Sequence, residues 1–302
     1  MTVKNRSKYC LMVSAAIMVI ALVLTIFGLG VNFGIDFTGG LSMQYAMGGE
    51  YNKADVEEIL NGLNIGTYTI TEQGTNEINI RVKDINQDDV QTLQASFEEQ
   101  LFAKYTSASR NGDVNYVGPV AGQTLLTNAF VSVLLAGALM LIYIAIRFDF
   151  NSGVAAVFGL LHDVLMMWAF MVLLRNVIQM NSSYIAAMLT IVGYSINNTI
   201  VIFDRIRENV RKMPSAPKEE VVNKSVRECL GRTVNTTLTT LITIVSLYIL
   251  GVDSIREFAL PIIIGIVSGV YSANMINGYV WAFLEEKKRA RKLHPKQAKA
   301  KA

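Results

Sequence analysis

Six apolar runs, each close to the length needed to cross a membrane, constrain the fold of this chain more than any other feature. They lie at Cys10–Val31, Thr124–Ile146, Val154–Leu174, Ser183–Phe203, Thr233–Leu250 and Phe258–Phe283. About 20 residues of α-helix cross the roughly 30 Å of hydrocarbon in a bilayer. Only 17% of the residues are charged, against about 25% in soluble domains. We therefore predict a multi-pass membrane protein with six transmembrane helices.

Basic residues are distributed unevenly around these runs, and their distribution predicts the orientation. Three Lys or Arg precede the first run, eight separate the fourth from the fifth, and eight follow the sixth. The short loops at 175–182 and 251–257 hold one each. Cytoplasmic loops carry the excess of Lys and Arg. Both termini are therefore expected in the cytoplasm, together with a basic loop at 204–232 and a basic tail at 284–302, for which membrane lipid is the expected partner.

The first run could instead belong to a cleaved signal peptide, because basic residues precede it. Its apolar stretch of about 20 residues is longer than the core of a signal peptide, and no A-x-A-like cleavage site follows it. We therefore expect residues 1–31 to form a cytoplasmic N-terminus and a retained first transmembrane helix.

The segment at 32–123 is acidic, with thirteen Asp or Glu and five Lys or Arg, and is expected on the extracytoplasmic side. Its apolar residues alternate at the strand period in some stretches and follow the helical period in others. The predicted elements are a strand at 41–46, a helix at 53–61 capped by Asn52, strands at 67–71 and 78–82, a helix at 84–104 and a strand at 113–117. This βαββαβ order predicts a small ferredoxin-like α+β domain between the first and second transmembrane helices. The other five helices then occupy 124–283.

The sequence predicts no enzyme. It contains no G-x-x-x-x-G-K-[ST] phosphate loop, and its only histidines are His162 and His294. Cys10 and Cys229 lie beside predicted spans on the basic side, so no disulfide framework is expected. We predict no catalytic residue, metal site or cofactor, and nucleic acid is not an expected partner.

Polar residues within the predicted spans indicate function, because burying them in lipid is costly unless they are paired. His162 and Asp163 lie deep in the third span, and Asp163 is the only carboxylate within any predicted span. A carboxylate there should be paired, hydrated or protonated. Adjacent helix residues diverge by about 100°, so the two side chains are not expected to share one face fully. A role in carrying ions or protons and a structural hydrogen bond between helices are both open.

Three further patterns lie in or beside the later spans. A polar stripe in the fifth span consists of Arg232, Thr236, Thr240 and Thr243. Arg232 either extends to the cytoplasmic surface or pairs with an acid on another helix. Small residues at 265, 269 and 273 predict close helix packing in the sixth span. Charged residues at the end of the fourth span could pair within their helix or hold the cytoplasmic loop; these are Asp204, Arg205, Arg207 and Glu208.

Five motifs in order give the chain a family resemblance. Phe33-Gly-Ile-Asp-Phe-Thr-Gly-Gly40, which includes Asp36, Gly39 and Gly40, resembles the signature of the SecD and SecF protein-export subunits. Val117-Gly-Pro-Val-Ala-Gly122, which includes Gly118, Pro119 and Gly122, resembles their V-G-P-x-x-G motif. Arg147-Phe148, His162-Asp163 and the run at 193–209 are closer to the SecF pattern than to the SecD pattern. The resemblance covers nearly the whole chain.

The resemblance implies a function in protein export across the bacterial cytoplasmic membrane. SecF-like subunits of the RND superfamily pair with a SecD-like subunit and associate with the SecY-type channel complex. They use the proton or sodium gradient to help complete export of a translocating polypeptide, which SecA drives from the cytoplasm. The glycines of the two motifs, near 39–40 and 118–122, are candidate hinges for the extracytoplasmic domain.

One position departs from the family pattern. The family usually has G-Y-S-I-N-D-T in the fourth span and its Asp is central to ion coupling, whereas this chain has Asn198. An amide cannot carry a proton at physiological pH. The resemblance places the partner arginine of the next span at Arg232. The ion-pathway candidates are therefore Asp163, Asn198, Arg232 and His162.

Three consequences of Asn198 are open. The SecD-like partner supplies the only essential carboxylate, which we favour; or Asp163 takes over; or coupling in this subunit is lost. The alternatives to the main reading are a structural or assembly subunit of the same complex without its own ion coupling, and an RND-type exporter of small molecules.

Overall fold

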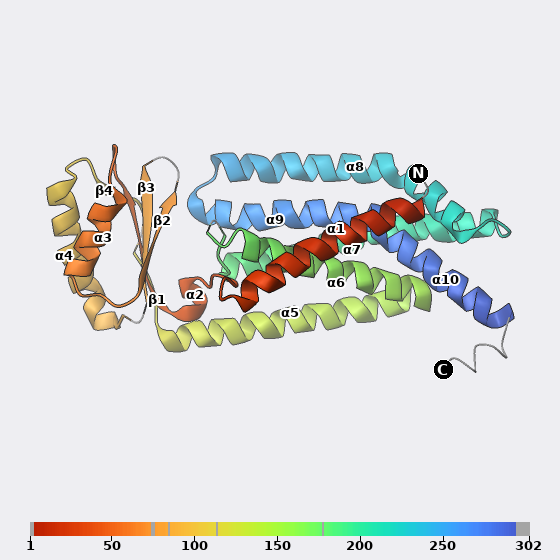
Figure 1. Cartoon of the computed structure of the whole chain (residues 1–302), viewed down its shortest axis with the longest axis horizontal. Helices are drawn as coiled ribbons and strands as arrows, with labels where there is room; N and C mark the ends of the chain where they lie inside the picture. The colour runs from red at the N-terminus through yellow and green to blue at the C-terminus, as the bar shows by residue number, and fades with distance from the viewer. Residues whose placement is uncertain (1–2, 74–75, 84, 113, 177, 294–302) are drawn as a thin grey trace. The chain divides into compact units, whose positions relative to one another are not determined.

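The computed structural model describes residues 3–73, 76–83, 85–112, 114–176 and 178–293 of the 302-residue chain. The chain divides into two compact units (Figure 1). The larger unit comprises residues 1–32, 133–178 and 183–302, and it contains most of the long helices. The smaller unit comprises residues 33–132 and 179–182, and it contains the β-sheet.

Within the described residues, six helical spans are long and apolar enough to cross a membrane, which confirms the six predicted spans. They are α1 (Val3–Ile26), α5 (Pro119–Arg147), α6 (Phe150–Leu173), α7 (Ser182–Lys212), α8 (Lys218–Leu250) and a sixth span that combines α9 (Asp253–Ser272), the π-helix η1 (Ala273–Asn277) and α10 (Gly278–Leu293). The first predicted span extends to Val31, but α1 ends at Ile26. The reason is local: Gly28 adopts φ +79°, a left-handed conformation that terminates helices.

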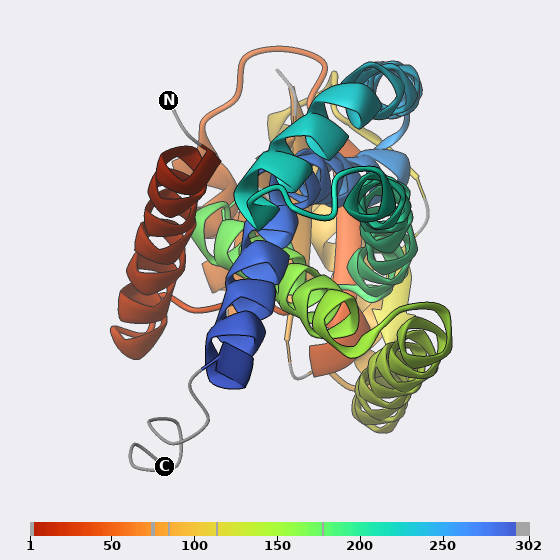
Figure 2. The same ribbon diagram turned by 90° about the vertical axis from the view of Figure 1, so that its right-hand side faces the viewer.

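The interior of the larger unit is built by α6, α7 and the sixth span, each with half or more of its apolar window buried. Figure 2 looks along these helices and places α1 and α5 at the edge of the bundle. A Cβ atom at Gly265 on α9 would lie 2.5 Å from Ile191 Cγ1 on α7. One at Gly269 would lie 3.2 Å from Ser195 Cβ. These close approaches confirm the predicted small-residue packing face.

The smaller unit has the ferredoxin-like topology that the sequence predicts. Its strands are β1 (Gly40–Ala46), β2 (Tyr68–Gln73), β3 (Glu77–Val82), β4 (Ser109–Arg110) and β5 (Asn115–Val117). The sheet order is β2-β3-β1, and β4 and β5 pair with successive parts of the other edge of β1. All pairs are antiparallel, with Met43 opposite Ile80 and Ile80 opposite Ile70. The short strand β4 was not predicted, and Asp113, in the predicted last strand, lies outside the described residues.

The hydrophobic core of this unit packs one face of the sheet against α3 (Lys53–Gly62) and α4 (Gln87–Lys104). Met43 and Tyr45 of β1 are fully buried together with Phe97 of α4. Asn52 caps α3 as predicted, because its side chain accepts a hydrogen bond from the Ala54 amide at 3.0 Å. The short helix α2 (Ile35–Thr38) precedes β1.

Candidate functional site

Asp163 is the centre of a buried polar cluster among the helices. Its side chain is 1% exposed. Ser268 donates to Asp163 Oδ1 at 2.9 Å, Ser272 donates to Oδ2 at 2.8 Å, and Ser195 also donates to Oδ2. The cluster therefore ties α6 to α7 and α9 through one carboxylate.

His162 extends the cluster to α1. Its Nδ1 atom lies 3.0 Å from Asp163 Oδ1, and its Nε2 atom lies 2.9 Å from Ser14 Oγ. Ser14 Oγ is 3.4 Å from Tyr271 Oη, which donates to the carbonyl of Cys10. The result is a continuous chain of polar groups from α1 to the carboxylate.

His162 and Asp163 contact different helices, as the divergence of neighbouring side chains predicts: Asp163 contacts α7 and α9, and His162 contacts α1. Both side chains are buried, and they are hydrogen-bonded to each other. The Cα–Cβ vectors of neighbouring helix residues do diverge, but the imidazole is long enough to reach the adjacent carboxylate. The local sequence does not predict this contact, because the His162 ring also contacts Ser14 of another helix.

A second polar group lies on α7 and η1. Asn198 is 3% exposed, and among the described residues its Nδ2 atom has no hydrogen-bond partner. The adjacent Thr199 accepts a hydrogen bond from Asn277 Nδ2 at 3.0 Å. Asn277 is the last residue of the π-helix, a distortion that often occurs at functional positions. Buried amide atoms without partners are costly and mark this region for a role other than packing.

Arg232 lies away from the Asp163 cluster. It is exposed on α8 and forms no hydrogen bond or ion pair with any residue that the structure describes. Thr236 and Thr243 of the predicted stripe are also exposed. The hydroxyls of Thr240 and Thr243 donate to carbonyls one turn earlier in their own helix. This chain therefore presents a polar stripe on a helix of membrane-spanning length.

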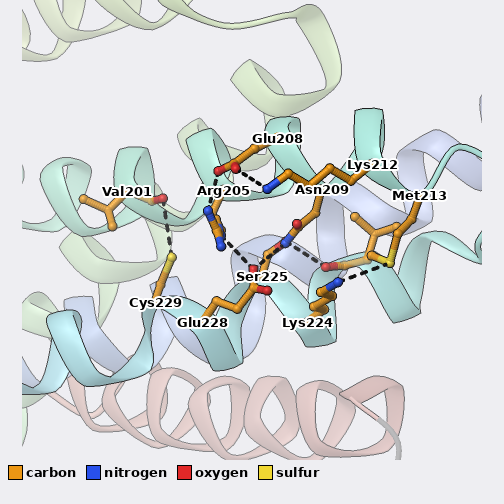
Figure 3. Close-up of polar contacts among 11 residues, drawn as sticks. Val201, Arg205, Glu208, Asn209, Lys212, Met213, Lys224, Ser225, Glu228 and Cys229 are labelled. Carbon is orange, nitrogen blue, oxygen red and sulfur yellow. Dashed lines mark hydrogen bonds and ion pairs between the residues drawn. The ribbon is translucent and has the colours of Figure 1, made fainter.

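At the other end of α7, charged residues connect it to the start of α8 (Figure 3). Arg205 binds Glu208 within α7, and its Nε atom donates to Glu228 of α8 at 2.7 Å. Asn209, 1% exposed, donates to Glu228 at 2.7 Å and to Ser225 at 3.0 Å. Arg205 therefore pairs both within α7 and with α8, while the cytoplasmic placement of this loop stays a prediction.

Arg147 at the end of α5 also binds α7. Its Nη2 atom donates to both carboxylate oxygens of Asp204, at 2.9 Å and 2.8 Å. The guanidinium carbon lies 5.5 Å from the centre of the Phe148 ring, within the range of a cation–π contact. The Arg147-Phe148 motif therefore holds α5 against the charged end of α7.

The two glycine motifs pack on each other within the smaller unit. A Cβ atom at Gly122 would lie 3.0 Å from the Gly39 amide nitrogen, and one at Gly39 would lie 3.0 Å from Pro119 Cα. Gly40 has φ +127°, and a Cβ atom there would lie 2.4 Å from the Val82 carbonyl oxygen. A side chain at Gly40 would displace the backbone of Val82, and side chains at Gly39 and Gly122 would crowd neighbouring backbone atoms. Their predicted role as hinges stays a prediction.

Two other motif residues lie beside helix starts. Asp36 accepts a hydrogen bond from the Ser182 amide at 2.9 Å, which satisfies one of the free donors at the start of α7. Gly118 lies next to Pro119, the first residue of α5. The motif from Phe33 to Gly40 therefore contacts the start of α7 through Asp36.

Sequence reasoning singled out Asp163 and His162, and the family-like run at 193–209 includes Ser195, but four members of the buried cluster were missed. These are Ser14, Ser268, Tyr271 and Ser272. Serine is common at helix contacts in membranes, where it serves packing, so its presence in a span predicts no particular partner. The only available signal was that each lies in an apolar run.

Comparison with protein families gives two matches. The family described as protein export membrane protein SecD/SecF, C-terminal, matches residues 97–287. The SecD/SecF GG motif matches residues 25–47. The second match includes the glycine pair at 39–40, and the first includes the buried polar cluster on α6, α7 and α9.

Known proteins with the same architecture are similar over most of the chain. Protein translocase subunit SecF of Thermodesulfovibrio yellowstonii is 36% identical over 88% of this chain and 89% of its own length. SecF of Alicyclobacillus acidocaldarius is 36% identical over 91% of this chain and 90% of its own length. The crystal structure of SecDF, a translocon-associated membrane protein from Thermus, superposes with a TM-score of 0.80 at 32% identity. The match covers 93% of this chain but only 38% of that longer protein.

Proposed function

The chain belongs to the SecD/SecF family of protein export membrane proteins, where its relatives are SecF subunits, and we propose that it pairs with a SecD-like subunit to promote protein export. The observation that carries this proposal is the match of 93% of the chain to a SecDF protein of which it spans 38%. A separate subunit would supply the remaining part. The proposal includes association with a SecY-type channel and SecA, and it assigns no catalysis to this chain.

Exposed polar residues on two membrane-spanning helices support a partner subunit. On α7, Thr190, Gly193 and Asn197 are exposed and recur at helical spacing. On α8, Arg232, Thr236 and Thr243 are exposed. Such groups are unfavourable against lipid, and small or polar residues are typical of contacts between transmembrane helices. We propose that the SecD-like subunit covers these faces.

The charge distribution supports an orientation. With the Lys and Arg excess at the cytoplasmic side, both termini, the loop at 204–232 and the tail at 284–302 lie in the cytoplasm of a bacterial cell. The domain predicted at 32–123 then lies on the other side of the cytoplasmic membrane, where the polypeptide emerges. We propose that it contacts the translocating chain there.

The ion coupling of the complex involves both subunits in this proposal. Asn198 cannot carry a proton, so the carboxylate opposite Arg232 is supplied by the SecD-like subunit. The alternative is a purely structural subunit without coupling, and it is favoured by one observation, the amide at position 198. The two proposals predict different results for variants of residues in the membrane interior. A coupling subunit predicts that such variants change export without changing assembly of the complex, and a purely structural subunit predicts that they do not.

The test compares two glycines on membrane-spanning helices. At positions 193 on α7 and 137 on α5, a Cβ atom would have no neighbour within 4 Å outside the local helix backbone, so a side chain at either position begins in open space. Tagged full-length chain with G193L or G137L is extracted from its native membrane in mild detergent, and the co-purifying proteins are identified by mass spectrometry. We expect a six-span SecD-like partner with the unchanged chain and with G137L, but much less with G193L.

Two results would contradict the proposal. Recovery of the unchanged chain alone, or only as a self-dimer, would indicate an independent transporter or scaffold. Equal recovery of the partner with G193L and G137L would show that the α7 face is not the contact, although pairing itself would stand.

A further inference from the structure

The hydroxyl of Ser14 has two possible acceptors. Its Oγ atom lies 2.9 Å from His162 Nε2 and 3.4 Å from Tyr271 Oη. A serine carries one hydrogen and two lone pairs. When Nε2 is unprotonated, Ser14 donates to it. When Nε2 carries a hydrogen, the imidazole donates to Ser14 Oγ, and the serine hydrogen turns to Tyr271. Both protonation states of His162 are therefore satisfied without moving a heavy atom.

The hydroxyl of Ser272 has the same property on the other side of the pair. Its Oγ atom lies 2.8 Å from Asp163 Oδ2 and 3.2 Å from the Gly269 carbonyl oxygen. With Asp163 ionised, Ser272 donates to the carboxylate. With Oδ2 protonated, the carboxyl donates to Ser272 Oγ, and the serine hydrogen turns to Gly269. The cluster thus accepts one added proton at either member of the pair.

The charge balance favours such a proton. His162 and Asp163 are 5% and 1% exposed. Among the described residues, no Lys, Arg or second carboxylate forms a hydrogen bond or ion pair with either of them. With a neutral imidazole the pair carries one uncompensated negative charge, which is costly away from water. One proton makes the pair neutral overall.

Among the described residues, the titratable side chain next to the pair on the helices packed against α6 is that of Tyr271 on α9, whose ring centre lies 6.1 Å from that of His162. Cys10 on α1 contributes its carbonyl, which binds Tyr271, and Glu285 on α10 binds Asn151 near the start of α6. On α7 the group that contacts Asp163 is the hydroxyl of Ser195. The pair is therefore the natural place for an exchangeable proton.

We infer that His162 and Asp163 form a proton-binding pair within this chain, separate from Asn198 and Arg232, with Ser14 and Ser272 as switching hydroxyls. The pair takes up one proton and releases the same proton, so no other reactant is consumed. This inference deepens the proposed function, and it rests on that function only where it predicts that the proton affects protein export. The occupancy of the pair itself can be measured on the chain without any partner.

The test uses the fact that the sequence contains only two histidines. In full-length chain with H294Q, labelled with ¹⁵N-histidine and reconstituted in phosphatidylcholine–phosphatidylglycerol nanodiscs, every imidazole signal belongs to His162. The variant H162Q, which retains only His294, is the matched control for assignment. Nuclear magnetic resonance spectra are recorded from about pH 5 to about pH 9, the range in which histidine titrates. We expect one reversible single-proton transition of His162.

Variants then test the roles of the partners. D163N removes the carboxylate member of the pair and is expected to change the transition most. S14A removes the acceptor of the Nε2 hydrogen and is expected to change it less. S268A removes a hydroxyl that contacts only the carboxylate and is expected to change it least.

Two outcomes overturn the inference. If the imidazole keeps one protonation state over the whole pH range, His162 is a structural group. This measurement uses an unchanged His162–Asp163 pair, so misfolding of a variant of the pair does not affect the result. Signals that respond to sodium chloride in place of choline chloride, but not to pH, indicate a sodium site instead. Either result leaves the pairing with a SecD-like subunit to be decided by its own experiment.

Discussion

Gly159 on α6 leaves open the space that the Asn277 amide occupies, since a Cβ atom at position 159 would lie 2.2 Å from Asn277 Oδ1. The amide is 1% exposed, and its Nδ2 atom is held by Thr199 at 3.0 Å. It therefore cannot move aside without losing this hydrogen bond. The absence of a side chain at 159 is what allows the last residue of the π-helix to enter the interior.

We expect Gly159→Ala to destabilise the protein by about 1–3 kcal/mol, the usual cost of added atoms in a packed interior. Thermal unfolding of the full chain in nanodiscs measures this. The control is Gly137→Ala, where no atom lies within 4 Å of the new Cβ and a gain of up to about 1 kcal/mol is expected in a helix. The double variant with Asn277→Ala should lose less stability than the two single losses combined. Equal effects at 159 and 137 would show that the amide can be displaced freely.

Much of the fold could be predicted from the sequence, because it depends on local periodicity. Apolar length is sufficient to recognise a span, and the alternation at Ile78, Ile80 and Val82 is sufficient to recognise a strand that is buried on one face. The strand β4 escaped prediction because two residues carry no period.

The candidate site could be predicted only in part. Asp163 is conspicuous as a carboxylate in an apolar run, but its donors come from α7 and α9, and His162 is held by Ser14 of α1. Which helices meet depends on tertiary packing, and one sequence does not encode it in any short pattern. The role of Gly159 is hidden for the same reason, since its neighbour Asn277 is distant in sequence.

Asp163→Asn is expected to lower the rate of protein export by about tenfold or more, which corresponds to about 1.4 kcal/mol, without reducing the amount of assembled complex. The amide has nearly the same shape but binds no proton. The control Ser268→Ala keeps the carboxylate and removes one donor, and export should fall less. Export into membrane vesicles and recovery of the tagged complex are measured together. A parallel loss of complex and export would instead indicate that the carboxylate is structural.

Acid should loosen the contact between α3 and α4 in the smaller unit. Tyr105 Oη donates to Asp55 Oδ2 at 2.6 Å, and Lys104 Nζ lies 3.2 Å from Asp55 Oδ1. These two groups, the tyrosine first, hold the pKa of Asp55 below its usual value of 3.8. Because the folded-state pKa is the lower one, the stabilisation is present above 3.8 and is lost as the pH falls through the folded value.

Hydrogen exchange of the α3 amides in the full chain, followed through this acid range, measures the effect. Tyr105→Phe should make the pH dependence shallower, because the folded pKa of Asp55 then returns toward its unfolded value. The matched control is Tyr68→Phe, which removes a tyrosine hydrogen bond of 2.8 Å to the neutral amide of Asn61. In that control, any change in the exchange rate of the α3 amides should be the same at every pH. Identical pH slopes for Tyr105→Phe and the unchanged chain would exclude Asp55 as the titrating group.

Asn198→Asp restores a carboxylate at the position where the SecF pattern has one. The side chain is 3% exposed, and its Nδ2 atom has no partner among the described residues, so this change removes no hydrogen bond made by that atom. We expect export to become more sensitive to the proton gradient, by up to about tenfold per pH unit, because the occupancy of a titrating carboxyl changes by that factor. The complex should still assemble.

The control for this change is Asn198→Ser, which is neutral and cannot titrate in this range, so its export should follow the same pH dependence as that of the unchanged chain. Export into inverted vesicles is measured across a pH series at fixed membrane potential, with the amount of complex quantified in each sample. If the aspartate and serine variants give the same profile, position 198 does not contact the ion pathway in this subunit. The coupling carboxylates would then be those of the partner and of Asp163, which the unchanged chain already contains.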